Sequence, residues 1–120
     1  MKQVILESPY AGDIAHNVAY ARACVRDSLL RNEAPIASHL LYTQEGILRD
    51  DVPAERKLGI AAGLSWLPVA DLMAVYIDYG VSEGMGAAIK KANEIGVRVE
   101  MRKILDEQNS YGFHEGRVKK

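Results

Sequence analysis

Several features that stabilise other proteins, or direct them to a membrane or out of the cell, are scarce in this chain. Its 120 residues include one cysteine, Cys24, so an internal disulfide framework is excluded and a reducing compartment is favoured. No apolar run approaches the roughly 20 residues of a membrane span, and residues 1–3 lead into an apolar stretch without the pattern of a signal peptide. The sequence therefore predicts a cytoplasmic protein that does not bind a membrane.

An excess of charge of one sign is also absent, since 15 lysines and arginines face 16 aspartates and glutamates. Without a long-range positive field, binding to nucleic acid would require a local basic patch. The basic cluster at residues 117–120 is expected to be a solvated tail. We therefore predict no nucleic-acid partner.

Signatures of cofactor and metal chemistry are missing as well. No Gly-x-Gly-x-x-Gly motif follows the first apolar stretch, and the loop after it lacks the hydroxyl- and glycine-rich run that cradles a flavin phosphate. His16 and His114 lack metal-ligand spacing with cysteines or carboxylates. Cys24 lies in an apolar helical pattern without an adjacent histidine, which predicts a packed thiol. The sequence thus predicts no cofactor and no metal.

What the sequence does contain is a regular alternation of strand and helix signals, in a chain that is 48% hydrophobic. The predicted strands cover residues 3–7, 35–42, 71–78 and 97–104, and the predicted helices cover residues 14–31, 53–67 and 82–95. This order is typical of one α/β domain, residues 1–104, followed by a polar tail, residues 105–120. We expect a flavodoxin-like three-layer sandwich with a mainly parallel sheet of four or five strands.

Local signals mark the ends of several helices. Asp13 and Ser82 are expected N-caps, Pro53 suits a first helical turn, and Gly96 suits a helix C-terminus. In the helix that begins at Pro53, apolar spacing predicts an inward face formed by Leu58, Ala61, Ala62 and Ser65 or Trp66. Trp66 itself is expected in the core or at a subunit interface.

Residues 75–86 form the most informative segment, because they combine an apolar strand, a carboxylate at its end and a glycine-containing loop that opens a helix. Ligands of parallel α/β sheets bind outside the carboxyl ends of the strands. This rule places three segments on one rim, namely Ser8-Pro9-Tyr10, residues 39–42 and Asp78-Tyr79-Gly80.

Each of three side chains on this rim fits two interpretations. Tyr10 and Tyr42 can stack on a base or pack at the edge of the core. His39, inside a predicted strand, fits either a structural histidine or a ligand contact. Glycines at Gly80 and Gly84 let the backbone approach a bound group closely.

Three motifs occur in an order that resembles the nucleoside 2-deoxyribosyltransferase-like superfamily, over residues 3–104. They are Ser8-Pro9-Tyr10 after the first strand, Asp78 at the end of the third, and Ser82-Glu83-Gly84-Met85 at the start of the next helix. The superfamily includes many small uncharacterised members that are often phage-encoded. Members with known activity break or exchange N-glycosidic bonds of nucleosides and nucleotides with a helix-borne glutamate nucleophile.

The resemblance implies a deoxyribosyltransferase-like fold and assigns roles to several residues. Asp78 would accept hydrogen bonds from ribose hydroxyls or an exocyclic amine. Ser82 and the Gly84 and Met85 amides would bind a phosphate, although a plain N-cap role for Ser82 stays open.

The same resemblance places Ala88 where the nucleophilic glutamate is expected, and an alanine cannot attack a sugar. Glu83 is the nearest carboxylate, and it fits either a helix-end stabiliser or a replacement nucleophile. Ala88 also fits a core-facing stripe with Met85, Ile89 and Ala92, in which case the motif alignment shifts by one helical turn.

Three functional hypotheses follow. The first, which we carry forward, is a homo-oligomeric nucleotide-binding protein without the nucleophile. In a phage it would sequester an immune signal of ADP-ribose or cyclic-nucleotide type in the host cytoplasm. The second is an active N-glycoside hydrolase or 2-deoxyribosyltransferase that uses Glu83 or a glutamate from a neighbouring chain. The third is a structural or regulatory α/β module.

Overall fold

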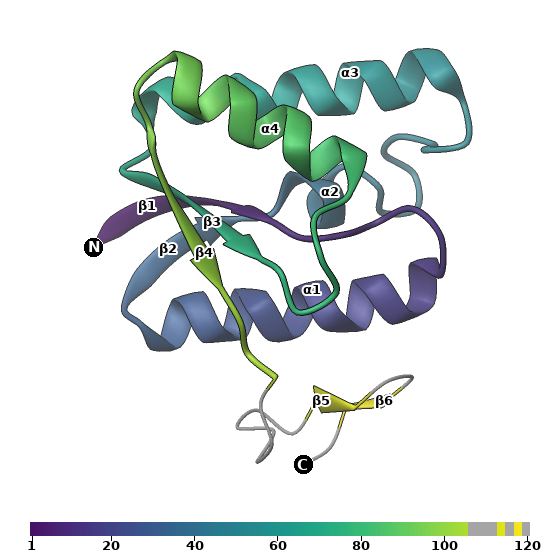
Figure 1. Ribbon diagram of the computed structural model, residues 1–120. Coiled ribbons are helices and arrows are strands. Elements are labelled where there is room, and N and C mark those ends of the chain that lie inside the picture. The colour runs from purple at the N-terminus through teal and green to yellow at the C-terminus, as the bar shows by residue number, and fades with distance from the viewer. Residues whose placement is uncertain (106–112, 115–116, 119–120) are drawn as a thin grey trace.

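Four parallel strands form the main sheet of the computed structural model, which describes residues 1–105, 113–114 and 117–118 (Figure 1). In spatial order the strands are β2 (Glu33–Ile36), β1 (Lys2–Glu7), β3 (Leu72–Tyr76) and β4 (Arg98–Arg102). Helix α1 (Ile14–Leu30) covers one face, and helices α3 (Pro53–Leu64) and α4 (Glu83–Glu94) cover the other (Figure 1). The predicted three-layer α/β sandwich is confirmed, with four strands that are all parallel.

Four short elements complete the described structure. Helix α2 (Ser38–Leu41) and the 3-10 helix η1 (Leu67–Val69) lie in the two connections that flank α3. Strands β5 (Phe113–His114) and β6 (Arg117–Val118) pair antiparallel. The rest of the predicted tail after Leu105 lies outside the described residues. Among the described helices, none has the length and apolar character that a bilayer crossing requires.

The inner strands are apolar on both faces because helices cover both sides of the sheet. On the α1 side, the buried cluster contains Val4, Leu6, Tyr20, Cys24, Leu72, Ala74 and Tyr76. On the opposite side, it contains Ile5, Leu67, Met73, Val75, Met85, Ala88 and Ala92. Cys24 is fully buried and burial raises its pKa, so the prediction of a packed thiol is confirmed.

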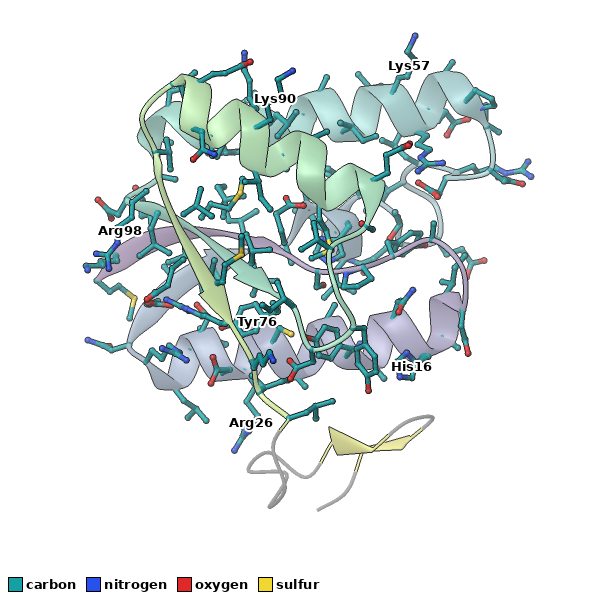
Figure 2. The ribbon with its side chains drawn as sticks, in the orientation of Figure 1. His16, Arg26, Lys57, Tyr76, Lys90 and Arg98 are labelled. Carbon is teal, nitrogen blue, oxygen red and sulfur yellow. The ribbon has the colours of Figure 1, made fainter. Side chains whose placement is uncertain are left out.

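A buried ion-pair network crosses the α1 face. Arg102 Nη1 and Nη2 donate to the two carboxylate oxygens of Glu33 at 2.8 and 2.7 Å. Arg102 also donates to Glu100 at 2.7 Å and to the Tyr76 hydroxyl at 3.1 Å. The Tyr76 side chain, which lies between the sheet and α1 (Figure 2), donates its hydroxyl hydrogen to Asp27 at 2.6 Å. The buried charges of this network therefore compensate one another.

The predicted second strand over residues 35–42 is wrong beyond Ile36. The chain turns at Ala37 into the helical turn α2, closed by the Tyr42 amide donating to the Ser38 carbonyl at 2.9 Å. This turn packs on α3 at Gly63, where an added Cβ would collide with the Ser38 side chain. A short apolar run cannot distinguish strand from helix by periodicity, so this tertiary contact decides the outcome.

The predicted inward face of α3 is also wrong. Leu58 is 59% exposed and Trp66 is 44% exposed, whereas Gly63 is buried. Helix α3 packs at Gly63 against Ser38 of α2 and at Gly59, four residues earlier, against Leu48 and Tyr42. The apolar stripe on the other side of the helix therefore faces outward. Figure 2 shows Lys57 of α3 and Lys90 of α4 pointing away from the sheet.

The predicted helix ends are confirmed. Asp13 Oδ1 accepts a hydrogen bond from the His16 amide at 3.1 Å and so caps α1. Ser82 caps α4, and Pro53 occupies its first-turn position in α3. Gly96 has a φ of +81°, the left-handed conformation in which glycine commonly ends a helix.

Candidate ligand-binding site

The carboxyl ends of β1 and β3 form the point where the sheet changes winding direction. The chain leaves β1 through α1 toward β2 on one side, and leaves β3 through α4 toward β4 on the other. In open parallel sheets the crevice at this point is where ligands bind. Three segments lie at this edge of the sheet, to which we give the name crevice: the residues that follow β1, the loop from Ile77 to Ser82, and the N-terminus of α4.

Glu7, the last residue of β1, is a carboxyl group at this crevice. It lies in register with Val75 of β3, two residues beyond the pair Ile5 and Met73. Because side chains two residues apart share a face of a strand, Glu7 points to the α4 side, as Ile5 does. Burial alone raises the pKa of Glu7 to about 7. Within the described part of the chain, its carboxyl makes no hydrogen bond or ion pair.

Ser8 and His39 meet next to Glu7. The buried Ser8 hydroxyl and His39 Nε2 are 2.7 Å apart, which joins the end of β1 to α2. Burial lowers the pKa of His39 to about 4, so its imidazole is neutral at pH 7. The structure thus brings together two of the predicted site residues, although His39 lies on a helix rather than on the predicted strand.

Asp78 follows β3, as predicted, but its carboxylate is largely used within the fold. Oδ1 accepts from the Tyr20 hydroxyl at 2.6 Å and from the Ile104 amide at 2.9 Å, and Oδ2 accepts from the Leu105 amide at 2.9 Å. A carboxylate offers about four acceptor sites, so roughly one remains for a ligand. Asp78 therefore holds the segment after β4 against β3 and α1.

The N-terminus of α4 offers backbone donors. Ser82 Oγ accepts from the Met85 amide at 3.2 Å, and the Met85 side chain is buried in the core. The amide of Met85 is therefore already used. The amides of Glu83 and Gly84 have no acceptor among the described residues, and both residues are exposed. Together with the helix dipole, they favour an anion at this end.

No carboxylate of α4 reaches the crevice from the buried face of the helix. Ala88 is 5% exposed and packs with Val75 and Met85, so it lies on the core-facing stripe that the sequence suggested. The acidic residues of α4, Glu83 and Glu94, are both exposed. Chemistry at the crevice therefore depends on Glu7 or Glu83.

Comparison with sequence models of known protein families identifies the family of the chain. The sequence model of one family, described as "Domain of unknown function (DUF7768)", matches residues 2–102. The chain belongs to the DUF7768 family. No curated protein matches the sequence.

The remaining predicted site residues of this DUF7768 domain lie elsewhere on the rim. Tyr10 lines a hollow with Val18 and Arg22 of α1, and that hollow does not include Glu7 or Asp78. The Tyr42 hydroxyl accepts from Trp66 Nε1 at 3.3 Å, beside α3. A second hollow is formed by residues 43–51 and Glu55.

Two further predicted residues lie in the loops that follow β1 and β3. Pro9 comes after Ser8 and is partly exposed. Gly80 is exposed and has a φ of +87°, a conformation that side chains rarely adopt. Gly80 therefore fixes the course of the loop that leads from β3 to the start of α4.

Glu7 is not among the site residues that the sequence predicts, because residues 3–7 have the pattern of a buried strand. The signal was present, because Glu7 continues the face of Ile5 in a strand covered on both sides. A charged residue on such a face is rare without a partner or a function.

Proposed function

We propose that the protein binds an intact nucleoside or nucleotide in the crevice between β1 and β3. The observation that carries this proposal is the coincidence, at the winding change of the sheet, of two unpaired amides at α4 with the unpaired Glu7 carboxyl. Such an arrangement suits a ligand with an anionic group at one end and hydrogen-bond donors near it. The sequence resemblance to deoxyribosyltransferase-like proteins points to the same class of ligand.

Binding without cleavage is favoured because Ala88 occupies the buried face of α4 and cannot act as a nucleophile. We extend the proposal to a homo-oligomer that sequesters an ADP-ribose-type or cyclic-nucleotide signal, in the host cytoplasm if the protein is phage-encoded. Exposed apolar side chains on and after α3, such as Leu58 of the helix and Trp66 beyond its end, are available for contact between copies.

Mass spectrometry of released ligand tests the proposal. The protein is incubated with nucleosides, nucleotides, NAD and ADP-ribose, washed and denatured by heat. Recovery of an intact nucleotide or ADP-ribose in stoichiometric amount is expected. Recovery of none of these compounds would overturn the proposal. Release of free base with turnover would show that the protein cleaves its ligand, which also contradicts the proposal.

A backbone variant tests the position of the anion. Glu83 is the first residue of α4, where proline is well tolerated, and Ser82 has the extended conformation, φ −74° and ψ 169°, that a following proline requires. Glu83→Pro therefore removes one amide donor without breaking the helix. We expect it to weaken ADP-ribose binding about tenfold, the loss typical of a charge-assisted hydrogen bond. Glu83→Gln, which keeps the amide, should bind as well as the wild type or better.

A second candidate function is N-glycoside hydrolysis or 2-deoxyribosyl transfer by Glu83. The observation that favours it is the exposed position of the Glu83 carboxylate in the first turn of α4, at the border of the crevice. This function predicts that free base accumulates from a nucleoside or nucleotide and that Glu83→Gln abolishes its accumulation. Unchanged turnover in Glu83→Gln would rule out Glu83 as the nucleophile.

A further inference from the structure

Two carboxyl groups lie at the carboxyl ends of neighbouring strands, and they differ in their hydrogen bonds. Asp78 accepts three hydrogen bonds from Tyr20 and from the amides of Ile104 and Leu105. Glu7 accepts none from the described residues, and its side chain is partly buried at the end of β1, which raises its pKa. A partly buried carboxyl without a partner in the fold is available to hydrogen-bond donors of a ligand.

The surroundings of Glu7 limit what that partner can be. On its face of the sheet lie the apolar side chains of Val75, Met85 and Ala88, which share one cluster with Ile5. The titratable groups at the same rim are the neutral His39, the hydrogen-bonded Asp78, the exposed Glu83, and Tyr79, whose ring packs against that of His16. Among the described residues, no cation forms an ion pair with Glu7.

We propose that Glu7 accepts hydrogen bonds from the 2′- and 3′-hydroxyls of a ribose, so that the crevice selects ribonucleotides over 2′-deoxyribonucleotides. This inference rests on the proposed function. A phosphate held by the Glu83 and Gly84 amides brings the sugar, which is the next group of a nucleotide, over the strand ends. The two oxygens of one carboxylate match two neighbouring hydroxyl donors.

The role is that of an acceptor, and its protonation state provides a second readout. Hydroxyl donors favour the ionised form of Glu7, so the ratio of the affinity for a ribonucleotide to that for its deoxy counterpart should rise as the pH increases from 6 to 8. The ratio is used because the phosphate of both ligands also titrates near pH 6. A Glu7 that donated a hydrogen bond to a base would leave the ratio unchanged. Glu7→Gln should make the ratio independent of pH.

Calorimetric titration with the four ribonucleoside 5′-monophosphates and their 2′-deoxy counterparts tests the inference. In the wild type, the affinity for at least one ribonucleotide should exceed that for its deoxy counterpart by a factor of about ten or more. Glu7→Gln should lower the affinity for that ribonucleotide more than the affinity for its deoxy counterpart, which retains only the 3′-hydroxyl, so that the preference largely disappears. Glu94→Gln, a substitution at the far end of α4, serves as the control and should bind as the wild type does.

The outcomes separate the two proposals. Equal affinity of the wild type for the two sugars, or a preference that survives in Glu7→Gln, overturns the role of Glu7 while nucleotide binding stands. Failure of the wild type to bind ADP-ribose or any of the eight compounds at millimolar concentration overturns both. The sugar preference of the wild type does not depend on any variant, so the test holds even if Glu7→Gln proves unstable.

Discussion

On the α1 face of the sheet, each buried charged side chain described has a hydrogen-bonding partner, whereas on the α4 face the Glu7 carboxyl has none. The α1 face contains the pairs of Arg102 with Glu33 and of Asp27 with Arg31 and Tyr76. These interactions fix one arrangement of strands and helix. The buried cluster on the α4 face is apolar. The unpaired Glu7 carboxyl at its rim is therefore a candidate for a functional group.

The largest effect is expected from breaking the network of the α1 face. Arg102→Met leaves the buried Glu33 without its cationic partner, so the free energy of unfolding should fall by about 3–5 kcal/mol. Urea denaturation measures the change. Arg49→Met, which breaks the exposed pair with Asp51, is the control and should leave stability unchanged. Equal effects of the two substitutions would contradict the structural role of the network.

Next in size is the opposite pH dependence of two variants at the rim. The folded-state pKa of Glu7, about 7, lies above its ordinary 4.5, so the stability it contributes at low pH is lost as the pH rises through this range. The pKa of His39, about 4, lies below its ordinary 6.5, so its contribution is lost as the pH falls through that range. Each contribution amounts to at most about 3 kcal/mol.

In the wild type these two contributions oppose each other. Glu7→Gln should therefore make the free energy of unfolding increase from pH 4.5 to 7, and His39→Gln should make it decrease over the same interval. Urea denaturation at pH 4.5, 5.5 and 7 measures both slopes. Two variants with the slope of the wild type would show that neither group titrates abnormally.

Asp78→Asn should have a somewhat smaller effect. An amide in place of the carboxylate keeps one acceptor atom but faces a backbone donor with its NH2 group, so we expect a loss of about 1–3 kcal/mol. Thermal or urea unfolding at pH 7 detects it. Glu7→Gln under the same conditions should be neutral or stabilising. An Asp78→Asn variant as stable as the wild type would indicate that the Asp78 carboxylate serves ligand binding rather than the fold.

The smallest effect concerns the cap of α4. Ser82→Ala removes the acceptor of the Met85 amide and should cost about 1 kcal/mol, the usual value for an N-cap serine. Ser82→Asp, which retains an acceptor, should restore stability while it weakens the binding of an anion at the same helix end. A Ser82→Ala variant as stable as the wild type would contradict the cap.

The sheet and its long helices could be predicted from the sequence because their signals are local. Strands buried on both faces read as apolar runs, and Asp13, Ser82 and Gly96 mark helix ends directly. Helix α2 could not be predicted, since its formation depends on the close approach of Ser38 to Gly63, 25 residues further along the chain. The exposed stripe of α3 has the same origin.

The candidate site was only partly predictable, for a related reason. Asp78 follows a strand and so looked like a ligand-binding carboxylate. Its partners, the amides of Ile104 and Leu105, come from a segment 26 and 27 residues later. Glu7 looked like part of a strand, and only the hydrogen bonds of the folded chain show that it lacks a partner. Sequence positions indicate which carboxylates reach the rim, while long-range contacts decide which of them remain available.

An amide NMR titration tests most directly whether the α4 side of the rim, rather than the α1 side, binds the ligand. Uniformly 15N-labelled protein is titrated with ADP-ribose. We expect the largest chemical-shift changes at the amides of Ser8, Glu83 and Gly84. Changes concentrated at Tyr10, Val18 and Arg22, in the hollow beside α1, or no changes at all, would contradict this expectation.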